Sequence, residues 1–396
     1  MKAASFVVEA HSAAKVVKAL ESCVERLRGP HWPSPAGTEP LENSSKGAAL
    51  VFVCGQLAQV LPELAEGIAA AKLGIPVLIA AGTAVLTQAG EVEDQSAASG
   101  LVWTGGRAEP VCVDSRSPED LGETLSRMIQ DRTAKTAPTV LLFPRSEGFS
   151  PEALSPLYES RGTPHVFGGG TIGPHGAYLV PAHGAPTTGS ACLLFLRGIS
   201  PPQLRTSPAC RLLTPLRPVT EVRGPMVLEI DGEPALDVLS EAGQELGEER
   251  LMFVALAPEE GGAPTLGGRA DVILRGVQGV DPVRRGILVS DEVREGMRLG
   301  LAVRDPQAAR SDLDAVTREL VRDIRGAAPS FGIYINCAGR GSKLYGQYDV
   351  DTRILRQRFG EMPIAGMASA FEVGPHAGRP ALQLFTGVLG LFTAPS

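Results

Sequence analysis

The chain has 396 residues, of which 43% are hydrophobic and 20% are charged, and its formal net charge at pH 7 is -7. This apolar content can fill two substantial cores, so the composition predicts a globular protein. The acidic balance and the lack of a basic block exclude the charge pattern of a nucleic-acid-binding protein and of a polybasic membrane surface.

The first predicted element is a helix over Ala13–Leu27. It carries Lys15, Lys18 and Glu21, and these charges exclude the apolar core of a signal peptide. No apolar run in the chain reaches the roughly 18 residues that a membrane-spanning helix needs. We therefore expect a cytoplasmic protein without a membrane partner.

From residue 49 onward, one unit of strand, loop, helix, strand and small-residue turn occurs three times. The copies occupy residues 49–83, 139–171 and 331–375. In the first copy an apolar run over Ala49–Cys54 precedes a helix over Val60–Leu73, and in the second the helix is expected over Pro151–Ser160. Three copies of one unit predict a repeated strand-helix-strand architecture.

The remaining predicted elements mix strands and helices without strict alternation. This mixture predicts an α+β fold: two related layered α/β domains with mixed, largely antiparallel sheets. A proline-rich span over Pro201–Pro218 places the domain boundary near residue 222, giving domains 1–222 and 223–396. The further elements are strands at Gly100–Trp103, Val111–Val113, Tyr178–Val180, Ala191–Leu196, Met226–Ile230, Leu251–Leu256, Ala270–Arg275, Gly286–Val289 and Met297–Val303, and helices at Pro118–Asp131, Glu233–Leu239, Pro306–Arg325 and Asp351–Phe359.

The cysteines and histidines give no sign of a metal or of a disulfide framework. The six cysteines lack paired spacing, and Cys54, Cys112, Cys192 and Cys337 lie in or at the end of apolar runs, which is typical of reduced, buried thiols. No His-x-x-x-His or Cys-x-x-Cys pair occurs. Gly168–Gly173 matches Gly-x-Gly-x-x-Gly, but a strand follows where a dinucleotide site needs a helix. We expect no metal and no cofactor.

The strongest functional signal is an apolar strand that runs into the loop Cys337-Ala338-Gly339-Arg340-Gly341. Arg340 offers a rigid fork of donors that suits a carboxylate, and the two glycines allow close approach of a ligand. A second strand and turn follow, with Gly366 and Glu372, whose carboxylate suits an ammonium group. Together they predict a site for an amino-acid-like zwitterion. The alternative is that Arg340 and Glu372 pair with each other or with backbone.

This order of elements resembles the FIST domain proteins, in which a FIST N-terminal part precedes a FIST C-terminal part, and the resemblance covers nearly the whole chain. Its most specific pieces are Ile230-Asp231-Gly232-Glu233-Pro234-Ala235, Gly279-Val280-Asp281-Pro282, Asp291-Glu292-Val293-Arg294-Glu295-Gly296, Arg304-Asp305, Cys337-Ala338-Gly339-Arg340-Gly341 and Phe385-Thr386-Gly387. The family's Gly-Glu-Ile-x-Pro is Phe371-Glu372-Val373-Gly374-Pro375 here. Phe371 in place of glycine is expected to narrow a pocket or to change what it admits.

The resemblance implies a sensory protein for small ligands, such as amino acids or their derivatives, that acts in signal transduction with a signalling protein as partner and without an output domain of its own. Expected ligand contacts come from Cys337, Gly339, Arg340, Gly341, Gly366 and Glu372, and no catalytic residue is expected. Two alternatives stay open: a hydrolase or transferase that depends on Cys337 as nucleophile, and a protein-interaction scaffold without a ligand.

Overall fold

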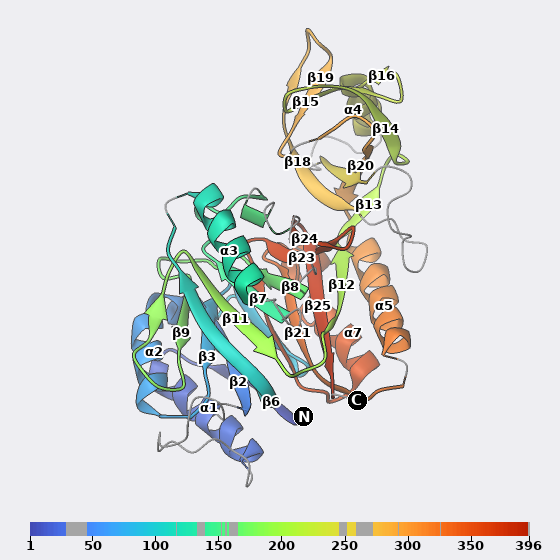
Figure 1. Ribbon diagram of the computed structural model, residues 1–396. Coiled ribbons are helices and arrows are strands. Elements are labelled where there is room, and N and C mark those ends of the chain that lie inside the picture. Colours follow the sequence, from blue (N-terminus) through green and yellow to red (C-terminus); the bar gives the residue numbers. More distant parts are fainter. Residues whose placement is uncertain are drawn as a thin grey trace.

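The computed structural model describes residues 1–28, 46–115, 117–132, 139–151, 153–154, 157, 165–244, 252–258, 272–291, 293–324 and 326–394. Most of the helix predicted over Pro151–Ser160, as well as Leu251, Ala270 and Arg325 at predicted element ends, lies outside these residues. The described strands form three sheets, and helices cover their outer faces (Figure 1). The predicted α+β class with mixed, layered sheets is confirmed.

The first sheet contains eleven of the described strands, in the order β10-β9-β3-β2-β6-β11-β7-β8-β23-β24, with β1 paired to β6. Gly100–Trp103 and Val111–Val113, predicted as two strands, belong to the single strand β6, so that prediction is wrong. The bounds are β1 (Ala3–Glu9), β2 (Lys46–Cys54), β3 (Val77–Ala81), β6 (Ala97–Val113), β7 (Thr139–Pro144), β8 (His165–Gly169), β9 (Ala177–Val180), β10 (Thr187–Thr188), β11 (Ala191–Arg197), β23 (Glu372–His376) and β24 (Arg379–Gln383).

The second sheet contains six described strands in the order β12-β25-β21-β22-β4-β5. Its bounds are β4 (Ala84–Thr87), β5 (Gly90–Val92), β12 (Gln203–Pro208), β21 (Pro329–Cys337), β22 (Ile364–Ser369) and β25 (Thr386–Thr393). The hairpin β4–β5 comes from early in the chain, yet it pairs with β22. Conversely, β23 and β24 come from the end of the chain and extend the first sheet through β8. The first and second sheets therefore each contain strands from both the N-terminal and the C-terminal half of the chain.

The third sheet stands apart from the other two in Figure 1 and has a hydrophobic core of its own around Val227, Val254 and Leu301. Residue 222, the predicted domain boundary, lies within β14. The helix predicted from Glu233 begins at Ala235 instead, because Glu233 and Pro234 pair with β15 as a short strand. The bounds are β13 (Cys210–Leu212), β14 (Arg217–Arg223), β15 (Met226–Ile230), β16 (Glu233–Pro234), α4 (Ala235–Gln244), β17 (Met252–Ala257), β18 (Ile273–Asp281), β19 (Gly286–Val289) and β20 (Arg298–Arg304).

The three predicted repeats each place two strands side by side and parallel. The parallel pairs are β2–β3, β7–β8 and β21–β22, and the other named strand pairs of the described chain are antiparallel. Parallel strands need a crossover connection, and in the first repeat it is the helix α2 (Leu61–Ala70). In the third repeat it consists of α6 (Ser342–Tyr345) and α7 (Val350–Phe359). The repeated unit therefore brings the ends of its two strands to one edge of a sheet.

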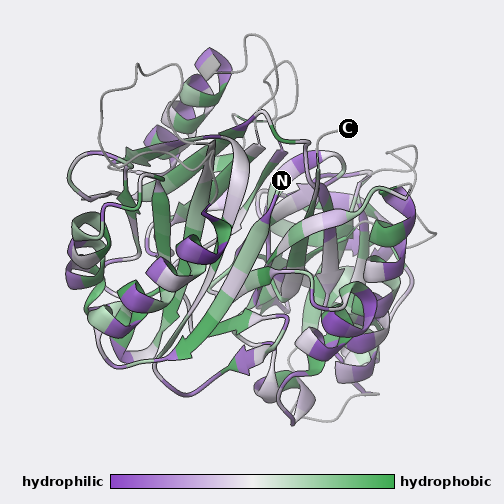
Figure 2. Ribbon diagram, turned by 90° about the horizontal axis from the view of Figure 1, so that it is seen from below, coloured by the Kyte–Doolittle hydropathy of each residue, from purple (hydrophilic) through white to green (hydrophobic). Residues whose placement is uncertain are grey.

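The first two sheets pack face to face and bury one large core between two layers of helices. Trp103 of the first sheet stacks on Phe331 of the second, with ring centroids 5.2 Å apart. Three helices pack on the outer face of the first sheet: α1 (Ala13–Leu27), α2 and α3 (Pro118–Arg132). The helices α5 (Pro306–Asp323) and α7 cover the second sheet. In Figure 2 the inner strands are mostly hydrophobic, while the helices carry hydrophilic stretches. This four-layer arrangement explains the strands' nearly continuous apolar runs.

The start of α5 shows how the sequence sets an element boundary. The side chain of Asp305 accepts a hydrogen bond of 2.7 Å from the backbone N–H of Ala308, and Pro306 occupies the first helical turn.

Within the part of the chain that the structure describes, no helix is both long and apolar enough to cross a membrane.

Candidate functional site

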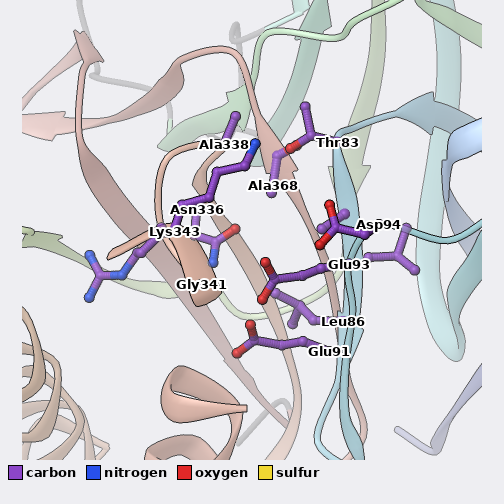
Figure 3. A pocket seen from close by; sticks show the side chains of 13 residues that line it. Thr83, Leu86, Glu91, Glu93, Asp94, Asn336, Ala338, Gly341, Lys343 and Ala368 are labelled. Atoms are coloured by element: carbon purple, nitrogen blue, oxygen red, sulfur yellow. The ribbon is translucent and has the colours of Figure 1, made fainter. Parts of the chain in front are cut away.

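A pocket opens where the hairpin β4–β5 meets the ends of β21 and β22 (Figure 3). Its cavity volume is about 30 Å³, room for one small polar group, and part of the space around it is open to solvent. Its lining comes from both halves of the chain: Thr83, Ala84, Val85, Leu86, Glu91, Glu93, Asp94, Asn336, Ala338, Arg340, Gly341, Lys343 and Ala368. The pocket lies beside the Cys-loop that the sequence singled out.

The hairpin and the two residues that follow it contribute an acidic wall to the pocket, formed by Glu91, Glu93 and Asp94. Figure 3 shows the carboxylates of Glu91 and Glu93 extending from the hairpin toward the side on which Asn336 lies. Glu93 accepts hydrogen bonds from the backbone N–H of Ser342, at 3.0 and 3.2 Å, and from its hydroxyl, at 2.7 Å. Glu91 accepts one of 3.3 Å from the N–H of Thr352. These contacts hold the hairpin against the loop and helix that follow β21.

Asn336 supplies a buried polar atom that has no protein partner. The residue is 3% exposed, lies in β21 and lines the pocket, and its side-chain oxygen makes no hydrogen bond. A buried carbonyl oxygen left unpaired costs free energy, so native proteins satisfy nearly all such groups. The side-chain oxygen of Asn336 can therefore accept a hydrogen bond from a molecule that enters the pocket.

Glu91 has a strongly shifted pKa. Burial, together with the nearby carboxylates of Asp351, Glu93 and Asp349, raises its pKa to about 8, against the hydrogen bond from Thr352. A cationic group beside Glu91 would relieve this repulsion. The lining thus combines the acidic side chains of the hairpin with the cationic Lys343.

We expect Glu91→Gln to change how stability depends on pH. Because the folded-state pKa is raised from 4.5 to about 8, the neutral carboxyl stabilises the fold fully below pH 4.5, and this stability is lost as the pH rises through 8. Glutamine stays neutral, so the variant's free energy of unfolding should rise relative to wild type between pH 5 and 8, by at most about 1.4 kcal/mol per pH unit. Urea unfolding at a series of pH values measures the difference.

The control for this prediction is Glu361→Gln, whose side chain is 71% exposed. A rise of the same size in the control would reveal a general effect of removing one negative charge and would contradict the role given to burial at Glu91. A difference between Glu91→Gln and wild type that stays constant across this pH range would contradict it as well.

Arg340 borders the pocket, but its guanidinium group is committed to protein partners. Its side chain is fully buried, and its Nε donates to Asp351 at 2.7 Å. The other nitrogens donate to the Ser207 carbonyl at 2.6 Å, the Ser207 hydroxyl at 3.3 Å and the Ala309 carbonyl at 3.5 Å. The sequence-based alternative of a structural pairing describes this residue best, although the partner is Asp351 and not Glu372.

Asp351 is the centre of a buried cluster that fixes the Cys-loop. Besides Arg340, it accepts hydrogen bonds from the hydroxyls of Tyr334 at 2.9 Å and Tyr345 at 2.7 Å. Burial raises the pKa of both tyrosines, so their hydroxyls remain donors. These three donors to Asp351 hold the loop backbone next to the pocket in place.

The three glycines predicted at the site lie at different distances from the pocket. Gly341 lines it, its φ of 68° favours glycine, and a Cβ there would also lie 2.5 Å from the Glu93 carboxylate. Gly339 lies against Arg304, whose guanidinium donates to the Gly339 carbonyl. Gly366 is in the middle of β22, where it packs on the Tyr334 backbone. Of the three, only Gly341 lines this pocket.

Cys337 and Glu372 lie together in a second buried cluster. One carboxylate oxygen of Glu372 accepts from the Ser369 hydroxyl and the other from the backbone N–H of Thr386, each at 3.1 Å. Burial raises the pKa of Glu372, which favours its neutral form. Burial and the nearby Glu372 raise the pKa of Cys337 to about 11, so a reactive thiolate is disfavoured at neutral pH. Neither residue is in the pocket lining.

Phe371, which replaces a glycine of the family pattern, packs away from this pocket. Its ring stacks on Phe149 with centroids 5.0 Å apart and covers Gly170, where a Cβ would lie 2.4 Å from the ring. The substitution therefore fills a neighbouring core, and the expected narrowing does not concern the pocket at Asn336.

Sequence reasoning missed most of the pocket's polar residues. Asn336 left a signal, since it is a polar residue inside the apolar run Phe331–Cys337. The acidic run of Glu91, Glu93 and Asp94 follows a glycine in an ordinary hairpin, and the contact of Glu93 with Ser342 spans 249 positions of sequence. Among the described residues, no cluster of three or more metal-binding side chains occurs.

Comparison with known proteins places two family models on this chain. The FIST N domain model matches residues 47–233 and the FIST C domain model matches residues 235–375. An uncharacterized protein of Mycobacterium tuberculosis is 32% identical over 193 residues, which are 47% of this chain and 49% of that protein. An uncharacterized protein of Mycobacterium bovis is 30% identical over 181 residues, 44% of this chain and 46% of that protein. The chain thus spans about half the length of the curated relatives it matches.

Proposed function

The chain belongs to the FIST family, whose domains are associated with small-ligand sensing in signal transduction, and on that premise we propose that it binds a small ligand in the pocket at Asn336. The observation that carries the proposal is the unpartnered side-chain oxygen of Asn336, buried in a pocket that residues of both family domains line. A ligand with a donor group would satisfy it.

The charges of the lining support an amino acid or a derivative of one. An ammonium group would lie by the acidic wall of Glu91, Glu93 and Asp94 and would donate to Asn336. A carboxylate would face Lys343, because the guanidinium of Arg340 is already paired with Asp351. Relative to the site expected from the sequence, the anion partner moves from Arg340 to Lys343, and the ammonium partner from Glu372 to the hairpin carboxylates.

The hairpin β4–β5 suggests how ligand binding in the pocket could affect the rest of the protein. It carries the acidic wall and is tied through Glu93 to Ser342, so a ligand that changes the charge balance of this wall also acts on the contact between the two halves of the chain. We propose that a separate signalling protein responds to this contact in the cytoplasm. All six cysteines are free thiols, which fits a reducing compartment.

The proposal is tested by thermal-shift measurements with a panel of amino acids, amino-acid amides, keto acids and short peptides. A ligand that binds only the folded state stabilises it by about 2.7 kcal/mol at 100 times its Kd. We expect wild type to be stabilised by at least one amine-bearing member and Asn336→Leu to lose that shift. Because the unpaired amide oxygen is removed along with its cost, Asn336→Leu should fold with near-normal stability.

The matched control is Thr352→Val. Thr352 is 2% exposed and its hydroxyl is also buried without a partner, but it is outside the pocket lining, so this variant should keep the ligand-induced shift. If the three proteins respond alike to every ligand, the pocket at Asn336 is not the binding site. If none responds to the whole panel, the ligand class is wrong and a scaffold without a small ligand is favoured.

A further inference from the structure

Two cysteines that lie 80 positions apart in the sequence meet in the first sheet. Cys112 on β6 is directly opposite Cys192 on β11 in the antiparallel register, and their sulfur atoms are 3.1 Å apart. Both are free thiols. Directly opposed residues on antiparallel strands have Cα atoms about 4.5–5.5 Å apart, within the range that a disulfide spans. A bond of about 2.05 Å therefore requires a small side-chain rotation and no change of strand register.

The surroundings make the two thiols unequal. Cys112 is partly exposed, whereas Cys192 is buried. The hydrogen bond with Cys192 lowers the pKa of Cys112, against burial and the nearby Asp114, and the same pairing with burial raises the pKa of Cys192 in spite of Arg145. Such a pair combines an accessible thiol that ionises more readily with a protonated neighbour.

The four other cysteines lack this arrangement. Burial raises the pKa of each, and for Cys54 and Cys337 it reaches about 11. The remaining two, whose pKa is also raised by burial, are Cys23 and Cys210. The contrast singles out the Cys112–Cys192 pair as the oxidant-sensitive position of the described chain.

We propose that Cys112 and Cys192 form a reversible intramolecular disulfide when the protein meets a hydroperoxide. The Cys112 thiolate attacks one oxygen of hydrogen peroxide, the O–O bond breaks, hydroxide leaves, and Cys112 becomes a sulfenic acid. The Cys192 sulfur then attacks the Cys112 sulfur, the S–O bond breaks, and the hydroxyl leaves with the Cys192 proton as water. Two thiols lose two electrons and two protons, and the peroxide becomes two waters. A dithiol reductant reverses the change.

Oxidation would alter the contacts of the hairpin β9–β10, which lies over the pair. The Cys192 thiol donates to the Ala177 carbonyl at 3.5 Å, and the Cys112 sulfur lies 3.4 Å from the Thr187 hydroxyl. A disulfide has no S–H to donate, so this hairpin loses that anchor while β6 and β11 become covalently joined. The redox response depends on neither the ligand pocket nor its occupant.

The test uses the full-length protein. After treatment with hydrogen peroxide and alkylation of the remaining thiols, we expect titratable thiols to fall from six to four per chain, and mass spectrometry to find one linked peptide pair containing Cys112 and Cys192, lighter by two hydrogens. Dithiothreitol should restore all six. Protein unfolded in urea should not show this selectivity, because the fold sets the approach of the two sulfurs.

Single variants separate the two steps. Cys192→Ser should form no linked peptide and should accumulate a sulfenic acid at Cys112 that dimedone traps, whereas Cys112→Ser should leave Cys192 unmodified. The proposal is overturned if wild-type Cys112 and Cys192 remain free while other cysteines oxidise, or if the native protein forms only links between chains. Thiol counts in wild type decide the question even if a variant fails to fold.

Discussion

Replacing Arg340 with alanine is expected to lower the free energy of unfolding by about 3–5 kcal/mol, the cost of breaking a buried ion pair. Both side chains of the Arg340–Asp351 pair are fully buried. Without the guanidinium group, the buried Asp351 loses its charge partner, and the carbonyls of Ser207 and Ala309 lose a donor. Chemical denaturation monitored by circular dichroism measures the loss.

Arg318→Ala is the control for this prediction. Arg318 pairs with Asp314 at 2.7 Å on the surface of α5, where its side chain is 57% exposed. Exposed pairs one helical turn apart contribute about 0.3–0.5 kcal/mol, so the control should change stability by no more than that. Equally small changes in the free energy of unfolding of both variants would contradict the structural role of Arg340. They would favour the ligand-binding role that the sequence predicted for it.

The second large effect is expected at Gly366, where alanine should destabilise the protein by about 3 kcal/mol or more, at the upper end of overpacking costs. A Cβ at this position would lie 1.7 Å from the carbonyl oxygen of Tyr334 on the neighbouring parallel strand. Because the obstacle is backbone, no side-chain rotation can relieve the clash. The strands β21 and β22 would have to separate beside the pocket.

Gly276→Ala provides the comparison. Gly276 is also a strand glycine, but a Cβ there would first meet the Ser290 hydroxyl at 3.8 Å, an ordinary contact. Unfolding measurements should therefore show a much smaller change than at Gly366. If Gly366→Ala folds with wild-type stability, the close approach of β21 and β22 is not as described, and the glycine would be free for the ligand-binding role inferred from the sequence.

The repeated unit was the part of the fold most readily predicted from the sequence. Apolar runs, separated by a helix and closed by small residues, predicted the three strand-helix-strand units, because local periodicity determines that pattern. The structure adds that the two strands of each unit are parallel neighbours. No local sequence pattern predicted that β4–β5 joins the second sheet or that β23–β24 joins the first. Which strands pair across distant segments depends on tertiary packing, and so the mixed layers could be expected but not their order.

The site was harder to predict for a related reason. The sequence drew attention to the loop at Cys337, beside which the proposed pocket lies, but a guanidinium group can pair with any carboxylate that the fold brings near. Asp351, only 11 positions from Arg340, was no more conspicuous than Glu372. The acidic wall could not be placed because Glu93 reaches Ser342 across 249 positions. The meeting of Cys112 and Cys192 is likewise a product of strand register, which spacing alone does not reveal.

The most direct test of the ligand-binding proposal is a crystal structure of the protein with the ligand that gives the largest thermal shift. We expect density for that ligand between the hairpin carboxylates and Asn336, with a donor group within about 3.2 Å of the Asn336 side-chain oxygen. Density at a different place on the protein, or an empty pocket under saturating ligand, would contradict the central claim.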